Sequence, residues 1–162
     1  MFKLKVEFYL KIIFIFSAIA LSSAFFIEYI LGHQPCNLCL FERIPYGLSL
    51  VLISAIFILR KNEKFFTLLL IITFVFSLAI SFYHYGIEQG FFEESAVCGV
   101  KDLSENITKK DLLKQLSEKT VSCKDVTFRI LGLSLTSINI IVSLIFIIAF
   151  IKIYNNYEKN KQ

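Results

Sequence analysis

The sequence predicts an all-α fold: an integral membrane four-helix bundle with two extracytoplasmic loops, the second of which contains a short amphipathic helix. Two observations predict this class. The composition is apolar, with 56% hydrophobic residues and 18 Phe among 162 residues. The apolar residues also fall in four stretches that approach the roughly 17 to 25 residues a helix needs to cross a bilayer. We expect a single membrane domain over 1–162, with spans at about 9–31, 44–59, 65–83 and 130–151.

The first stretch has some features of a secretory signal. Lys3 and Lys5 precede the apolar run, and Ser22-Ser23-Ala24 resembles a cleavage site. Apolar residues continue through that site as Phe25 and Phe26, and another span follows. We therefore expect a retained membrane helix.

The second stretch is the shortest of the four. It carries Pro45 and Gly47 near its start. Both would lie in the first turn of the helix, where a missing backbone donor costs little. We therefore count this stretch as a spanning helix.

Basic residues flank the spans on the side that would hold both termini. They are Lys3, Lys5, Lys11, Arg60, Lys61, Lys64, Lys152, Lys159 and Lys161. Because Lys and Arg near span ends favour the cytoplasmic side, we expect cytoplasmic termini, with loops at about 32–43 and 84–129 on the outer side. The formal net charge of +4 then indicates contact with anionic lipid in the bilayer and not with nucleic acid.

The long outer loop contains one helical signal. Thr108-Lys109-Lys110-Asp111 resembles a capping box, and Leu112, Leu113 and Leu116 follow on one side. We expect a short amphipathic helix there, either on the membrane surface or packed against the bundle.

All four cysteines fall in the outer loops. Cys36 and Cys39 are in the short loop, and Cys98 and Cys123 are in the long one. This placement favours an oxidising compartment in which thiol chemistry can occur. Three pairings are possible. A bridge between Cys98 and Cys123 would close a polar loop that a soluble partner could attack.

The Cys36-Asn37-Leu38-Cys39 spacing suits a redox-active disulfide, because one sulfur can be attacked while the other stays close enough to close the bond again. Zinc also uses this spacing and would take Cys98 and Cys123 as its other ligands. Haem attachment is excluded because Leu40 stands where His is needed. Static disulfides that staple the loops are the other interpretation, although a tight CxxC bridge restrains the unfolded chain weakly.

Arg43 follows Cys39 by four residues, one turn away on the same face if the helix already begins there. A fixed cation would favour a thiolate and could stabilise the oxygen of a quinone, a lipid-soluble electron acceptor, as it gains electrons. The other interpretation is an arginine that anchors a helix end at the headgroup level.

Three separated blocks resemble the bacterial disulfide bond formation protein B (DsbB) family. The first is Cys36-Asn37-Leu38-Cys39-Leu40-Phe41-Glu42-Arg43, and the second is Tyr83-His84-Tyr85-Gly86-Ile87-Glu88. The third is Cys123 followed by Ile130-Leu131-Gly132-Leu133-Ser134 through Asn139. With four spans and two outer cysteine pairs, the resemblance extends along nearly the whole chain.

The resemblance implies a multi-pass protein of the bacterial inner membrane with periplasmic cysteines. A reduced thioredoxin-like partner of the DsbA type would attack the Cys98–Cys123 disulfide, and Cys98 would form the mixed disulfide. Cys36 and Cys39 would then reoxidise the outer pair and pass electrons to the quinone pool. The relay of DsbA, DsbB and quinone is what keeps the bacterial periplasm oxidising.

The resemblance also implies a cofactor site without metal. Ubiquinone or menaquinone would bind near Arg43, with a thiolate at Cys39 as electron donor and His84 as a helper. Considered alone, His84 is better explained as an interfacial histidine without a ligand. Phe91, Phe92 and Phe128 stand where Trp is expected in relatives, which bears on the shape of the quinone pocket.

Three other functions compete with this interpretation. A nonenzymatic membrane assembly protein would keep its disulfides oxidised throughout. A transporter would carry charges along a pathway, but the spans have almost none apart from Lys11 and Glu28 near the ends of the first. An enzyme of the vitamin K epoxide reductase type would place its CxxC motif late in the chain.

Overall fold

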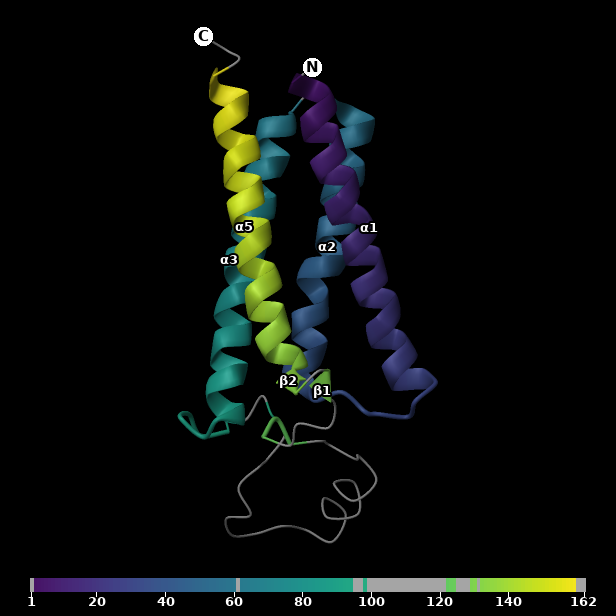
Figure 1. Ribbon diagram of the computed structural model, residues 1–162, viewed down its shortest axis with the longest axis vertical. Helices are drawn as coiled ribbons and strands as arrows, with labels where there is room; N and C mark the ends of the chain where they lie inside the picture. The colour runs from purple at the N-terminus through teal and green to yellow at the C-terminus, as the bar shows by residue number, and fades with distance from the viewer. Residues whose placement is uncertain are drawn as a thin grey trace, which may run out of the picture.

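The computed structural model describes residues 2–60, 62–94, 98, 122–124, 129–130 and 132–159. Its four long helices are α1 (Phe2–Tyr29), α2 (Asn37–Leu59), α3 (Glu63–Glu88) and α5 (Leu135–Lys159). They run up and down beside one another, so that both termini lie at one end of the bundle (Figure 1). All four are long and apolar enough to cross a membrane, which confirms the predicted all-α membrane fold.

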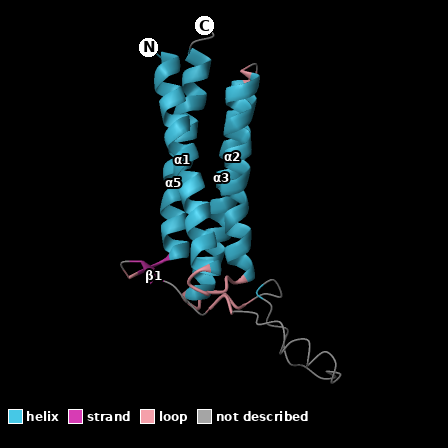
Figure 2. Cartoon of the chain, turned by 90° about the vertical axis from the view of Figure 1, so that its right-hand side faces the viewer, coloured by secondary structure: helices cyan, strands magenta, loops and turns pink. Residues whose placement is uncertain are grey.

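The helices form two layers, one of α1 with α5 and the other of α2 with α3 (Figure 2). Helix α5 packs mainly on α3, and α1 packs mainly on α2, whereas α1 and α5 contact each other least among the pairs of neighbouring helices. Toward the end that carries the cysteines, α1 also diverges from its neighbours (Figure 1). The side of the bundle between α1 and α5 is therefore the most open.

Helix α2 begins earlier than the expected span. Asn37 is its first residue, whereas the sequence predicted a start near 44. The helix starts here because Cys36 is extended and its sulfur accepts a hydrogen bond from the backbone N–H of Cys39 at 3.2 Å. Pro45 consequently lies in the third turn and not in the first. Its ring removes the bond to the Phe41 carbonyl, a loss that helices packed in a bundle tolerate.

The last helix begins later than expected. The predicted span started at about 130, but β1 (Arg129–Ile130) and β2 (Leu133–Ser134) form a minimal antiparallel hairpin before α5. Gly132 has a φ of +84° in the turn between them. Because this left-handed conformation cannot continue a helix, α5 starts only at Leu135. The amphipathic helix expected near 108–116 lies outside the described residues.

The apolar core lies toward the end that holds the termini. Phe74 is fully buried, and its ring packs edge-on against Phe146 at 5.0 Å and against Tyr46 at 5.9 Å. Large apolar side chains such as Ile58 and Phe76 point outward, as a surface in lipid requires. The core thus joins α2, α3 and α5 through aromatic contacts.

Hydrogen bonds between polar side chains add to this packing. Asn139 of α5 donates to the Ser81 hydroxyl of α3 at 2.7 Å and accepts from the Tyr46 hydroxyl of α2. Ser49 of α2 donates to Ser17 of α1 at 3.0 Å. Such bonds fix the relative register of membrane helices, because a polar group in hydrocarbon needs a partner.

Candidate functional site

The four cysteines form two disulfides. Cys36 pairs with Cys39 at a Cα–Cα distance of 5.1 Å, and Cys98 pairs with Cys123 at 5.6 Å. Both distances lie within the usual range of about 4.4 to 6.8 Å. The structure therefore has one of the three pairings that the sequence left open. Both pairs also belong to one buried cluster with Leu38 and Ile87, which brings the two loops together.

The four cysteines differ in burial. Cys98 and Cys123 are 1% and 2% exposed, and Cys36 is 5% exposed, whereas Cys39 is half-buried. The expectation that the Cys98–Cys123 bridge is open to attack is therefore wrong for this conformation. A soluble partner would reach it only after the cluster around it opens.

The Cys36–Cys39 disulfide stands at the N-terminus of α2. Cys36 is the cap residue, and its carbonyl also accepts from the N–H of Leu40 at 3.2 Å. The positive end of the helix dipole and the N–H of Cys39 both face the Cys36 sulfur. This setting favours a thiolate once the disulfide is reduced.

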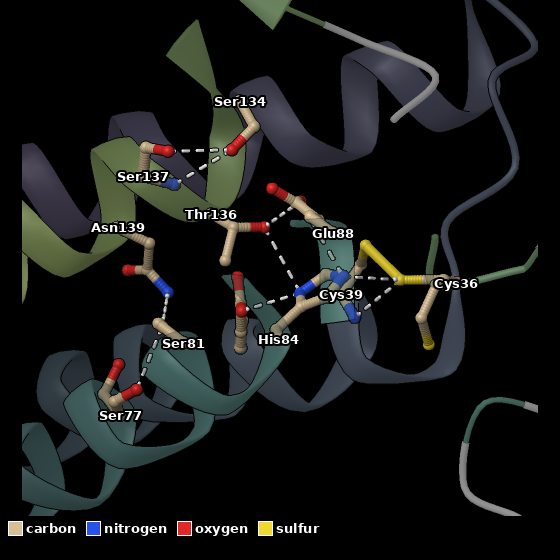
Figure 3. A network of polar contacts seen from close by, with 12 residues as sticks. Cys36, Cys39, Ser77, Ser81, His84, Glu88, Ser134, Thr136, Ser137 and Asn139 are labelled. Atoms are coloured by element: carbon tan, nitrogen blue, oxygen red, sulfur yellow. Dashed lines mark hydrogen bonds and ion pairs between the residues drawn. A yellow bond between two sulfur atoms is a disulfide. The ribbon is translucent and has the colours of Figure 1, made fainter. Parts of the chain in front are cut away.

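His84 of α3 is directed at this disulfide and is 2% exposed. Its Nε2 lies 3.6 Å from the Cys36 Sγ (Figure 3). Its Nδ1 lies 2.9 Å from Glu42 Oε1. The Thr136 hydroxyl of α5 lies 3.3 Å from the same Nδ1. Because a carboxylate accepts at Nδ1, the Nε2 lone pair faces the sulfur. Once the disulfide is reduced, the imidazole would be positioned to take a proton from the Cys36 thiol.

A second carboxylate lies beside the histidine. Glu88 Oε1 accepts a hydrogen bond from Thr136 at 2.6 Å and lies 3.9 Å from the Nε2 of His84 (Figure 3). The side chain is 5% exposed. Its Oε2 is buried and has no hydrogen-bond partner among the residues that the structure describes. A buried carboxylate oxygen of this kind is available for a proton or a cation.

Sequence reasoning gave no role to Glu42 or Thr136. Glu42 follows Cys39 by three residues and is therefore on the same face of α2, a signal that could have been used. Thr136 carried no such signal, because only the packing of α5 against α3 brings it to His84.

A cavity of about 250 Å³ opens next to the disulfide. Its α2 wall includes Cys39, Glu42 and Arg43, and Tyr46 and Asn139 also line it. Apolar side chains of α1 and α5 form most of the remaining wall: Phe16, Ala20, Leu21, Ala24, Ile27, Leu135, Ile138 and Val142. His84 is not among the lining residues. It reaches the cavity through Glu42 and Thr136, which both contact its Nδ1 and both line the cavity.

Arg43 joins α2 to α1 at the edge of this cavity. Its guanidinium forms an ion pair with Glu28 and lies 5.4 Å from the centre of the Phe25 ring. The two charged side chains are 17% and 21% exposed. Arg43 is therefore both a helix contact and a cation at the cavity, so the two interpretations from the sequence are compatible.

Fold and site together define a class: a multi-pass membrane protein that holds two disulfides in one cluster at one end of a helical bundle. The family model described as "Disulfide bond formation protein DsbB" matches residues 7–153. The chain belongs to the DsbB family, which confirms the resemblance seen in the sequence. Membership assigns it to disulfide bond formation in a membrane, an oxidoreductase activity.

One curated relative also covers most of the chain. Uncharacterized protein RP370 of Rickettsia prowazekii (strain Madrid E) is 32% identical over 148 residues, which are 90% of this chain and 86% of that protein. Its name carries no activity. The similarity therefore agrees with family membership and adds no function.

Proposed function

We propose that the chain is a quinone-dependent thiol:disulfide oxidoreductase of the bacterial inner membrane, which reoxidises a periplasmic DsbA-like dithiol oxidase. One observation carries the proposal: Cys39, half of a CxxC disulfide, lines a mainly apolar cavity beside the guanidinium of Arg43. A static staple would need neither the cavity nor the cation.

In the proposed cycle, the dithiol of the partner reduces the Cys98–Cys123 disulfide by thiol–disulfide exchange, and Cys98 forms the mixed disulfide. The resulting thiols reduce the Cys36–Cys39 disulfide in the same way. Packing of both pairs in one cluster supports this transfer. Cys39 then gives two electrons to quinone, which takes up two protons and leaves as quinol while the Cys36–Cys39 bond re-forms.

The contacts of His84 supply a path for the proton of Cys36. The imidazole Nε2 accepts this proton from the thiol, and Nδ1 passes a proton to Glu42, which lines the cavity. His84 is thus a base for the cysteine. The helper role at the quinone that the resemblance implied would be indirect.

The cavity suits the head group of a quinone. Its volume of about 250 Å³ is just below the range of about 300 to 1,000 Å³ found for pockets that hold drug-sized ligands. We infer that the ring enters the cavity and that an isoprenoid tail runs outward between α1 and α5. Arg43 would stabilise the negative charge that develops on a quinone oxygen.

The burial of Cys98 and Cys123 favours a second candidate, a nonenzymatic membrane assembly protein whose disulfides staple the loops. Turnover separates the two. The purified protein is mixed with a reduced DsbA-like partner and a quinone, and partner oxidation is followed by thiol trapping in wild type, Cys39→Ser, Cys98→Ser and, as a control, Ser54→Ala. Within the part of the chain that the structure describes, Ser54 bonds to its own helix, at the Leu50 carbonyl.

We expect quinone-dependent oxidation in wild type and in the control, and its loss in both cysteine variants. An inactive wild type with all four cysteines locked as unreactive disulfides would remove the enzyme and leave the assembly protein.

A further inference from the structure

The sulfur and nitrogen atoms around His84 have the arrangement of a metal site. Sγ of Cys36, Sγ of Cys39 and a ring nitrogen of His84 all lie within 4.8 Å of one another. In the disulfide form, the two sulfurs are bonded to each other and offer no thiolate. Reduction would release two thiolates beside an imidazole, which is a ligand set that zinc prefers.

We propose that the reduced Cys36–Cys39 pair and His84 bind one zinc-class divalent cation, so that this protein has a metal site in its dithiol state only. Binding converts two thiols and Zn²⁺ into a zinc bis-thiolate and releases two protons, with no change in oxidation state. This site differs from the four-cysteine zinc site considered from the sequence, because Cys98 and Cys123 take no part.

The distance between histidine and cysteine suits the cation. Bonds of about 2.3 Å from zinc to sulfur and 2.0 Å to nitrogen put two ligands of a tetrahedral ion about 3.5 Å apart. His84 Nε2 and Cys36 Sγ lie 3.6 Å apart. The two side chains therefore need little rearrangement to hold one ion.

The surroundings of the histidine also suit a metal ligand. Histidines that bind metals through one ring nitrogen usually donate the other N–H to a carboxylate, which fixes the tautomer and the ring orientation. Here the Nδ1 of His84 faces Glu42 Oε1 at 2.9 Å, and Nε2 faces the sulfurs.

Glu88 is the independent indication of a ligand. Its buried Oε2 has no hydrogen-bond partner in the described part of the chain, and its Oε1 is 3.9 Å from the His84 Nε2. Glu88 lies outside the group of ligand atoms that are within 4.8 Å of one another, so its side chain would have to move toward the sulfurs to serve as the fourth ligand. If the proposed function holds, bound zinc would withhold both thiolates from quinone and hold the protein in its reduced form.

The test uses Co²⁺, whose thiolate complexes have charge-transfer absorption, and requires neither quinone nor partner. A Cys98→Ser/Cys123→Ser protein in detergent is reduced with a phosphine, and the phosphine is then removed under anaerobic conditions. The protein is titrated with Co²⁺, and Zn²⁺ is added to compete for the bound Co²⁺. We expect one ion per chain in the reduced protein and none in the oxidised protein.

Three variants in this background assign the ligands. His84→Gln should weaken Co²⁺ binding more than tenfold, and Glu42→Gln about 10- to 100-fold, as for other carboxylates that hydrogen-bond to a histidine ligand of a metal. His33→Gln, at the other histidine of the chain, should leave binding unchanged.

Unchanged affinity in His84→Gln, binding by the oxidised protein, or a need for Cys98 and Cys123 would each overturn the site. Should His84→Gln fail to fold, X-ray absorption spectroscopy of the zinc-loaded Cys98→Ser/Cys123→Ser protein identifies the ligands instead. Two sulfurs with an imidazole scatterer are expected, and a shell of sulfur and water alone would contradict the proposal. Loss of quinone turnover in the wild type would affect none of these results.

Discussion

Both ring nitrogens of His84 have partners, so the side chain connects Cys36 to Glu42. On one side is the Cys36 sulfur at 3.6 Å, and on the other is Glu42, which reaches the cavity. At the scale of single residues, the chemistry therefore depends on a buried imidazole between a thiol and a carboxylate.

Replacing His84 with Gln should slow quinone-dependent turnover by about 100-fold, at the lower end of the contribution expected from general acid–base catalysis. Glutamine keeps the approximate size but accepts no proton. The rate of partner oxidation is measured at saturating quinone in His84→Gln and in the control variant Ser54→Ala, whose residue does not line the cavity. Equal rates in wild type and His84→Gln would exclude the imidazole as the base.

Arg43 gives a prediction about quinone binding. Arg43→Ala should raise the KM for quinone about tenfold, or about 1.4 kcal/mol, because the cation at the cavity is lost. Glu28→Gln is the control, since it breaks the same ion pair but keeps the guanidinium. A similar rise in both variants would show that the contact between α1 and α2 matters and the charge does not.

The sequence identified those site residues that combine a reactive or charged side chain with a short, regular spacing along the chain. Cys36, Cys39 and Arg43 share one block, and the pairing of Cys98 with Cys123 follows from the resemblance. Thr136 was missed because its contact with His84 joins two helices across 52 positions. The spacing of residues along one helix does not predict a contact between two helices.

At the scale of helices, Asn139 holds three of them in register. Asn139→Ala removes its bonds to Ser81 and Tyr46 and should lower the free energy of unfolding by about 1 to 2 kcal/mol. Ser143→Ala removes a single bond to Ser77 at 3.2 Å, and about 0.6 kcal/mol is expected. Unfolding in mixed micelles with increasing SDS measures both. Equal losses would contradict the central role of Asn139.

Gly86 gives a second prediction at this scale. A Cβ there would lie 2.1 Å from the Phe92 ring, which stacks on Tyr83 at 5.7 Å. Gly86→Ala should displace this ring and cost about 1 to 3 kcal/mol, as overpacking does. The double variant with Phe92→Ala should cost less than the sum of the single changes. Additive losses in a double-mutant cycle would place the strain elsewhere.

Hydropathy predicted the four helices, because only apolar runs of this length satisfy the backbone within a bilayer. Their ends were missed where local geometry decides them. A sulfur cap at Cys36 starts α2 early, and the left-handed Gly132 delays α5. Neither feature changes the hydropathy of the segment.

At the scale of the whole molecule, both termini lie at the end opposite the cysteines (Figure 1). Positive residues at the terminal end predict that it is cytoplasmic. A green fluorescent protein fused after Gln162 should fluoresce, because this reporter becomes fluorescent in the cytoplasm but not when it is exported unfolded to the periplasm. A periplasmic alkaline phosphatase fused after His33 should be active. The reverse pattern would invert the proposed topology.

The site draws its side chains from segments that leave the ribosome far apart in time. Cys36 and Cys39 lie at the start of the second helix, His84 at the end of the third and Thr136 at the start of the last. During synthesis, the first cysteines would cross the membrane before their histidine exists, and the cavity would lack its α5 wall until the end. A nascent chain would therefore need its first disulfide to be formed by another oxidant, or by a completely folded copy of the same protein, before it could form disulfides itself.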